Sequence, residues 1–115
     1  MPCNSSPSPL DYDWLETEFG TDWPQRLALF VASTRPVIAA LADALAGGHQ
    51  AAALDAAHGA KGSAQMIGAG LLAEQCARIE AALESGDLVA AQRHGPGVAP
   101  LFAAVEAQLL AVQVA

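Results

Sequence analysis

The feature that most constrains the fold is an apolar stripe in the second half of the chain, repeated with the spacing of an α-helix. Leu72, Cys76, Ile79 and Leu83 follow one another at intervals of four, three and four residues. Side chains at that spacing lie on one side of a helix, whereas a half-buried strand requires strict alternation. The stretch from about Gly68 or Ala69 to Glu84 is therefore predicted to be an amphipathic helix with one buried face.

The composition extends this prediction to the whole chain. Hydrophobic residues make up 53% of the 115 residues and aromatic residues only 5%, and much of the apolar fraction is alanine. Alanine favours helices and contributes little strand propensity. The length corresponds to one domain. A single all-α domain is the expected result.

Glycine and proline mark the boundaries of the helices in the first half. A short helix is expected over residues 11–19, where it would close at Gly20. A long helix is expected to begin near Trp23 and to end at Gly47-Gly48. Pro36 lies inside this helix, where it removes one hydrogen bond and should bend the axis.

The second half is predicted to contain three more helical segments. One runs over residues 49–67, and the striped helix follows it. Ser85-Gly86-Asp87 then supplies a C-cap glycine and a new N-cap. The last segment covers residues 88–114 and is expected to break at Gly95-Pro96-Gly97. Four long helices with short connections predict an antiparallel up-and-down four-helix bundle, with the short N-terminal helix as a lid.

The two ends and the bulk charge narrow the class of protein. Residues 1–9 are rich in Ser and Pro and are expected to be a disordered tail, so the bundle domain would span residues 10–115. We expect no signal peptide, and no uninterrupted apolar run approaches the roughly 18 residues that span a bilayer. The formal net charge of -7 argues against binding nucleic acid. Cys3 and Cys76 make no disulfide framework, which favours the cytoplasm.

The candidate functional site lies in the third helix. Lys61 is the only lysine in the chain and follows His58 by three residues. At about 100° per residue, with His58 as zero, Lys61 lies at about -60°, Gly62 at about +40° and Gln65 at about -20°. The opposite, core-facing side is expected to hold Ala53, Ala56, Ala60, Ala64 and Ile67. His58 is therefore predicted to point away from the core, beside one cation.

Gly62 requires a reason of its own. A glycine inside a helix costs up to about 1 kcal/mol relative to alanine, and this sequence uses alanine almost everywhere else. A side chain one turn after His58 would crowd the imidazole ring. Its absence opens a path for a phosphoryl donor, while close helix packing is the structural alternative.

These residues suit the carriage of a phosphoryl group. A neutral imidazole has a nucleophilic nitrogen near neutral pH and can form a phosphoramidate. Lys61 would offset part of the added negative charge as a point cation. Gln65 either hydrogen-bonds the phosphoryl group or the partner or simply faces solvent. Ser63, at about 140°, is expected to bond the backbone or a neighbouring helix.

Other residues offer weaker alternatives. Leu54 lies at about -40° and is either part of a docking patch for a partner or an isolated exposed leucine. His49 and His94 are given no role. Asp55 and His58 share one side of the helix, but two ligands make no convincing metal site. We also find no catalytic triad and no glycine-rich nucleotide loop.

A family resemblance covers the same residues. The run Ala57-His58-Gly59-Ala60-Lys61-Gly62-Ser63-Ala64, with Gly68, Leu72, Cys76, Ile79 and Glu80 behind it, resembles the histidine-containing phosphotransfer (HPt) domain. That family's pattern is approximately His-x-Leu-Lys-Gly-Ser, then Gly, then Leu-x-x-x-Cys-x-x-Leu-Glu. The close match spans residues 54–84. Ala60 in place of the usual leucine and the break at residues 95–97 are departures from the pattern.

The resemblance implies a role for each matched residue. His58 would be the phosphoacceptor, Lys61 would assist with the phosphate charge and Gly62 would clear access. Glu80 matches the acidic or amide position of the neighbouring helix, which orients the imidazole through its second nitrogen; a plain surface carboxylate is the alternative. The Mg²⁺ used in transfer would belong to the receiver partner, so no cofactor is expected on this chain.

The leading hypothesis is therefore a histidine phosphotransfer protein without autokinase activity. It would accept a phosphoryl group from the receiver domain of a hybrid histidine kinase and pass it to a response regulator. A degenerate HPt-like bundle that serves only protein interaction is the alternative from another class. A dimeric phosphotransferase resembling the dimerisation part of a histidine kinase is disfavoured, because the chain has no ATPase-like domain.

Overall fold

The computed structural model describes residues 10–114, and every regular element among them is helical. The elements are α1 Tyr12–Phe19, the 3-10 turn η1 Gly20–Asp22, α2 Trp23–Ala46, α3 Gln50–Met66, α4 Gly70–Glu84, α5 Leu88–His94, the 3-10 turn η2 Gly95–Gly97 and α6 Val98–Val114. The all-α prediction is confirmed. The predicted tail, residues 1–9, lies outside the described residues.

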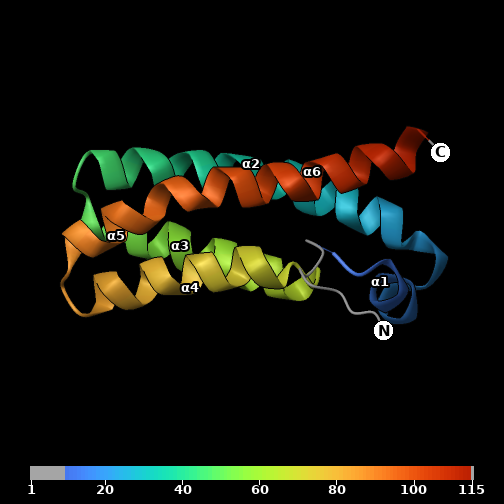
Figure 1. Ribbon diagram of the computed structural model, residues 1–115, viewed down its shortest axis with the longest axis horizontal. Helices are drawn as coiled ribbons and strands as arrows, with labels where there is room; N and C mark the ends of the chain where they lie inside the picture. The colour runs from blue at the N-terminus through green and yellow to red at the C-terminus, as the bar shows by residue number, and fades with distance from the viewer. Residues whose placement is uncertain (1–9, 115) are drawn as a thin grey trace.

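The long helices run up and down in alternation (Figure 1). α2 leads into α3, α3 into α4, and α5 with α6 returns along the molecule to contact α2 and α4. Each of the three turns between these helices contains a glycine with positive φ, namely Gly48, Gly68 and Gly86. Only glycine adopts that conformation without steric cost, so the predicted boundaries follow from the positions of these glycines.

The short helix α1 closes one end of the bundle, at the opposite end from α5 (Figure 1). The side chain of Asp11 caps it by accepting hydrogen bonds from the backbone N–H groups of Asp13 and Trp14 at 3.0 and 3.1 Å. Leu15 is fully buried, and the ring of Trp14 lies where a side chain at Gly68 would be. The α3–α4 turn therefore supplies the surface on which α1 rests.

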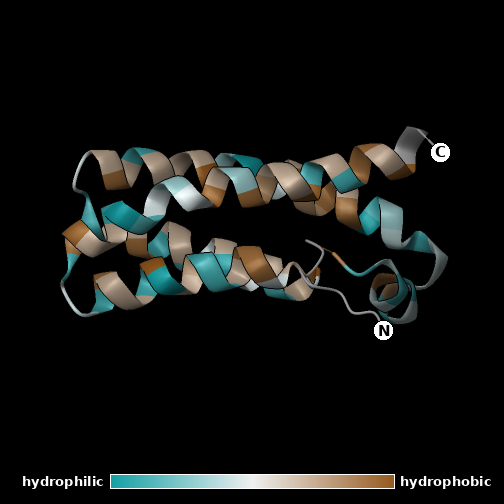
Figure 2. Ribbon diagram, viewed as in Figure 1, coloured by the Kyte–Doolittle hydropathy of each residue, from teal (hydrophilic) through white to brown (hydrophobic). Residues whose placement is uncertain are grey.

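The buried residues of α3 are all alanines, whereas most buried residues of α2, α4 and α6 have larger side chains. Ala53, Ala57, Ala60 and Ala64 are each 0% exposed. Ala56 was expected on the core side but is only half-buried, whereas Ala57 takes its place. The buried face of α3 is thus rotated slightly toward the side that carries Lys61. Figure 2 shows that hydrophobic positions, coloured tan to brown, dominate the helices and that hydrophilic positions are scattered between them.

The last α-helix is interrupted at Gly95-Pro96-Gly97, as expected, and the interruption is the 3-10 turn η2. His94, Gly95 and Val98 keep right-handed helical backbone conformations, and the chain continues in one direction through η2 (Figure 1). Two close contacts explain the glycines. A Cβ at Gly95 would lie 2.9 Å from Leu45 Cδ1, and one at Gly97 would lie 2.8 Å from Gln75 Nε2. The segment is therefore a packing adaptation within a continuous helical path.

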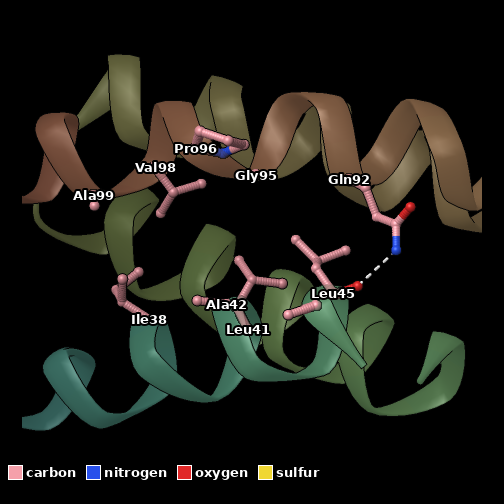
Figure 3. Close-up of a pocket in the computed structure, with 10 residues that line it drawn as sticks. Ile38, Leu41, Ala42, Leu45, Gln92, Gly95, Pro96, Val98 and Ala99 are labelled. Atoms are coloured by element: carbon pink, nitrogen blue, oxygen red, sulfur yellow. Dashed lines mark hydrogen bonds between the residues drawn. The ribbon is translucent and has the colours of Figure 1, made fainter. Parts of the chain in front are cut away.

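An apolar groove of about 350 Å³ remains between α2 and the η2 segment (Figure 3). Ile38, Leu41 and Leu45 line it from α2, and Gly95, Pro96 and Val98 line it from the other side. Gln92 closes one end by donating a hydrogen bond from Nε2 to the Leu45 carbonyl at 2.8 Å. The same carbonyl also accepts a hydrogen bond from the Gly48 backbone N–H at 3.2 Å, in the turn that ends α2.

One expectation about hydropathy needs correction. Two helical stretches in the described part of the chain, Tyr12–Ala46 and Leu88–Val112, are long and apolar enough to meet the length of a membrane span. Neither stretch is an uninterrupted apolar run, but the mean hydropathy over 18 residues is high in both, at 1.5 and 1.4. Both stretches contribute buried residues to the bundle. Length and composition alone do not place them in a membrane, because core helices of soluble proteins meet the same criterion.

Candidate functional site

His58 lies in the middle of α3 and points to solvent. Its side chain is 70% exposed, whereas the alanines on the opposite side of the helix are fully buried. The prediction that the imidazole faces away from the core is confirmed. An exposed ring on a rigid helix is accessible to a second protein without any rearrangement of the bundle.

Glu80 on α4 connects His58 and Lys61 across the α3–α4 interface. Its Oε2 lies 2.6 Å from His58 Nδ1, and its Oε1 accepts a hydrogen bond from Lys61 Nζ. The Glu80 carboxylate is only 10% exposed and the Lys61 side chain 25%. The contact between Glu80 and the imidazole was predicted. The ion pair with Lys61 was not predicted, although Lys61 lies on the side of α3 toward which the buried face is rotated.

This geometry determines which nitrogen of His58 is nucleophilic. An ionised carboxylate can only accept hydrogen bonds, so the nitrogen that contacts it must carry a proton. In a neutral imidazole the other nitrogen then holds the lone pair. Nδ1 faces Glu80, and Nε2 is therefore the free nucleophile on the exposed side of the ring.

The electrostatics keep the Glu80 carboxylate ionised. The hydrogen bond from Lys61 is the largest cause of the lowered pKa of Glu80, and the hydrogen bond from His58 acts in the same direction. Burial opposes both by raising the pKa, but the pKa still lies below its ordinary value. The cluster thus places an ionised carboxylate between the Lys61 ammonium group and the His58 ring.

The surface around the ring is open on the glycine side. A Cβ placed on Gly62 or on Gly59 would meet no atom within 4 Å. An alanine at Gly62 would therefore not touch the imidazole, contrary to the expectation that a side chain there crowds the ring. If Gly62 provides space, that space is used by a larger group, such as a loop of a partner protein, that approaches the ring from outside.

The remaining predicted residues lie at the edges of this face. Gln65 is exposed, and Ser63 is half-buried where α3 faces α2. Leu54 was considered as an exposed docking residue, but it is half-buried and packs against the core. Its position at about -40° lies on the same side as Lys61, toward which the buried face is rotated.

A groove between α2 and α3 was not anticipated. It has a volume of about 230 Å³ and is bordered by the exposed side chains of Leu29 and Met66, which are 68% and 76% exposed. Ser63 lines it from the helix that carries His58. Arg26 lies at one end, with its guanidinium 5.6 Å from the centre of the Phe19 ring. The position of Met66 at about +80° from His58 was the signal that could have revealed it.

One of the comparisons with known proteins, the comparison with protein families, found a match. The sequence matches the Hpt domain family over residues 25–114, which includes α3, α4, α5, α6 and all but the first two residues of α2. No curated protein and no solved structure gave a match. Because the match covers well over half of the sequence and contains the His58 cluster, the chain belongs to the Hpt domain family, whose helical bundles carry phosphoryl groups on a histidine in phosphorelays.

Proposed function

We propose that this protein accepts a phosphoryl group on His58 from the aspartyl phosphate of one receiver domain and passes it to the aspartate of another. The observation that carries the proposal is the orientation of the imidazole. Nδ1 is bonded to the Glu80 carboxylate, and Nε2 is exposed to an incoming donor. In the cytoplasm, a hybrid histidine kinase would supply the first receiver domain and a response regulator the second.

The transfer itself needs no proton from this chain. The Nε2 lone pair attacks phosphorus and forms a P–N bond while the P–O bond to the receiver aspartate breaks. The aspartate leaves as a carboxylate with the electron pair. Nδ1 keeps its proton, and the Nδ1–H group continues to donate a hydrogen bond to Glu80. Glu80 thereby acts as a positioning residue that fixes the tautomer and the ring direction. The reverse sequence returns the phosphoryl group to a second receiver.

Lys61 and Gly62 would support this step in different ways. Lys61 is the cation of the cluster, and in the resting protein its ammonium group is paired with Glu80. Three arginines are engaged elsewhere, with Arg26 over Phe19, Arg35 on Glu106 and Arg78 on Glu74. Gly62 leaves a bare backbone beside the ring, which allows a receiver loop to approach closely.

The groove between α2 and α3 is our candidate for the receiver contact. Leu29 and Met66 are large exposed apolar residues, and Met66 follows His58 by two turns on the same helix. An exposed apolar pair beside a reactive side chain is typical of an interaction surface. Leu54 is less suited to this role because it is half-buried and packs against the core.

The direct test is incubation with a phosphorylated receiver domain. Acid-labile, base-stable label should appear on the wild-type protein and should be absent from His58→Gln. His49→Gln and His94→Gln are the matched controls and should retain the label. The His58 side chain is mostly exposed, so its replacement should leave the thermal unfolding transition within a few degrees. Label retained on His58→Gln would remove the assignment of His58 as the acceptor. A wild-type protein that no receiver of the host labels would leave only the role of an interaction module.

A further inference from the structure

The Glu80 carboxylate accepts hydrogen bonds from two donors, and only one of these donors belongs to the ring that reacts. Its Oε2 bonds His58 Nδ1, while its Oε1 holds the Lys61 ammonium group. The side chains of Glu80 and Lys61 are both largely buried, with 10% and 25% of their surface exposed. An ion pair in such surroundings is less screened by water than one at the surface.

The phosphoryl group would form on the other side of the imidazole. Nε2 lies across the ring from Nδ1, so the ring separates a phosphoryl group from Glu80. Lys61 has a single ammonium group on a flexible stem. That group has three N–H donors, but it contacts Glu80 on the Nδ1 side of the ring, so a move toward phosphoryl oxygens at Nε2 lengthens its hydrogen bond to Oε1. The carboxylate would then keep His58 as its one partner in the cluster.

We propose that Glu80 and the phosphoryl group compete for Lys61, so that the resting ion pair weakens the stabilisation of phosphohistidine and keeps the phosphoryl group transferable. This inference rests on the proposed function, since it concerns the phosphorylated state of His58. The separation of a poorly exposed carboxylate from its cation has a cost, and that cost is subtracted from what Lys61 gains at the phosphoryl group. The lowered pKa of Glu80, caused first by Lys61, is consistent with a pair that resists separation.

The opposite arrangement is also conceivable, and it predicts the opposite sign. If Glu80 held Lys61 in position for the phosphoryl group, removal of the Glu80 charge would make Lys61 less useful. If the two compete, the same removal would make Lys61 more useful. A double-mutant cycle on Lys61 and Glu80 therefore distinguishes the two arrangements.

The experiment measures the equilibrium of transfer between this protein and one receiver domain for four proteins: wild type, Lys61→Met, Glu80→Gln and the double variant. Glutamine keeps an oxygen that accepts from His58 Nδ1 but carries no charge, and methionine keeps much of the lysine stem. The loss of phosphohistidine caused by Lys61→Met should be about fivefold larger in the Glu80→Gln background than in the wild type. Equal losses, or a smaller loss in the Glu80→Gln background, would overturn the competition.

Two controls make the result specific. Glu74 lies on the same helix and pairs with Arg78, so Glu74→Gln combined with Lys61→Met should show no coupling. If Glu80→Gln fails to fold, Lys61→Met alone still tests the idea: it should lower phosphohistidine in the wild-type background by less than about threefold. A larger loss would contradict the competition. Absence of phosphorylation in the wild type would instead defeat the proposed function, so the two failures are distinguishable.

Discussion

The α3–α4 pair and the α2–α6 pair solve the same packing problem in different ways. On α3 the buried positions are alanines, and a carboxylate from α4 reaches two side chains of its neighbour. Between α2 and the start of α6, larger side chains and the glycine–proline segment leave an apolar groove of about 350 Å³ (Figure 3). Small side chains allow close approach of two helices, and close approach is what lets one glutamate bridge His58 and Lys61.

The ion pairs of the two regions differ in how far their side chains are exposed to solvent. Arg35 on α2 and Glu106 on α6 lie 2.5 Å apart, but their side chains are 61% and 30% exposed. Lys61 and Glu80 are 25% and 10% exposed. A pair of the first kind contributes little to stability because water screens it. The Lys61–Glu80 pair is less screened by water, so a change at Glu80 should alter how strongly Lys61 interacts with a phosphoryl group.

The largest expected effect comes from adding volume to each region. Ala60 is 0% exposed, so Ala60→Leu should lower the free energy of unfolding by about 1–3 kcal/mol through overpacking. Ala42 is exposed at the edge of the α2–α6 groove, and Ala42→Leu should change it by less than about 0.5 kcal/mol. Urea denaturation of both variants measures the difference. Equal destabilisation would mean that the two helix pairs are packed alike.

A second comparison concerns the exposed leucines. Leu29 borders the groove beside α3, whereas Leu110 lies on α6, and they are 68% and 59% exposed. Leu29→Ser should reduce the rate of transfer from a phosphorylated receiver by about tenfold, and Leu110→Ser should leave it unchanged. Labelling by phosphoramidate, a small donor that needs no docking surface, should be the same for both. A Leu110 effect as large as that of Leu29 would remove the docking assignment.

The smallest effects come from two glycines in helical segments. A Cβ at Gly62 meets nothing within 4 Å, so Gly62→Ala should raise the free energy of unfolding by up to about 1 kcal/mol. At Gly97 the new Cβ would displace Gln75, which donates to the His94 carbonyl at 2.8 Å, so Gly97→Ala should lower it by up to about 1 kcal/mol. Thermal unfolding gives the two signs.

The larger variant Gly62→Gln tests access instead of stability. It should fold at least as well as the wild type, yet receive a phosphoryl group from a receiver more slowly, because its side chain occupies the approach to the ring. Transfer at the wild-type rate would show that Gly62 is not there for clearance.

Most of the fold was predictable because its signals are local. The helix boundaries follow from glycines in the turns, and the core stripe of α4 follows from the spacing of Leu72, Cys76, Ile79 and Leu83, all of which are buried. The exposed position of His58 also followed from one helical wheel. Leu54 was misjudged because a wheel gives angles around one helix and does not say how far the neighbouring helices extend around it.

The sequence alone determined that a histidine, a lysine and a bare glycine share the outer side of one helix, since residues three and four apart must do so in any α-helix. The tertiary structure decided that Glu80 takes both His58 and Lys61 as partners, that Leu29 and Met66 border one groove, and that Gly95 and Gly97 accommodate Leu45 and Gln75. These contacts join different helices, and their geometry depends on how closely the backbones approach, which is set by packing over the whole bundle.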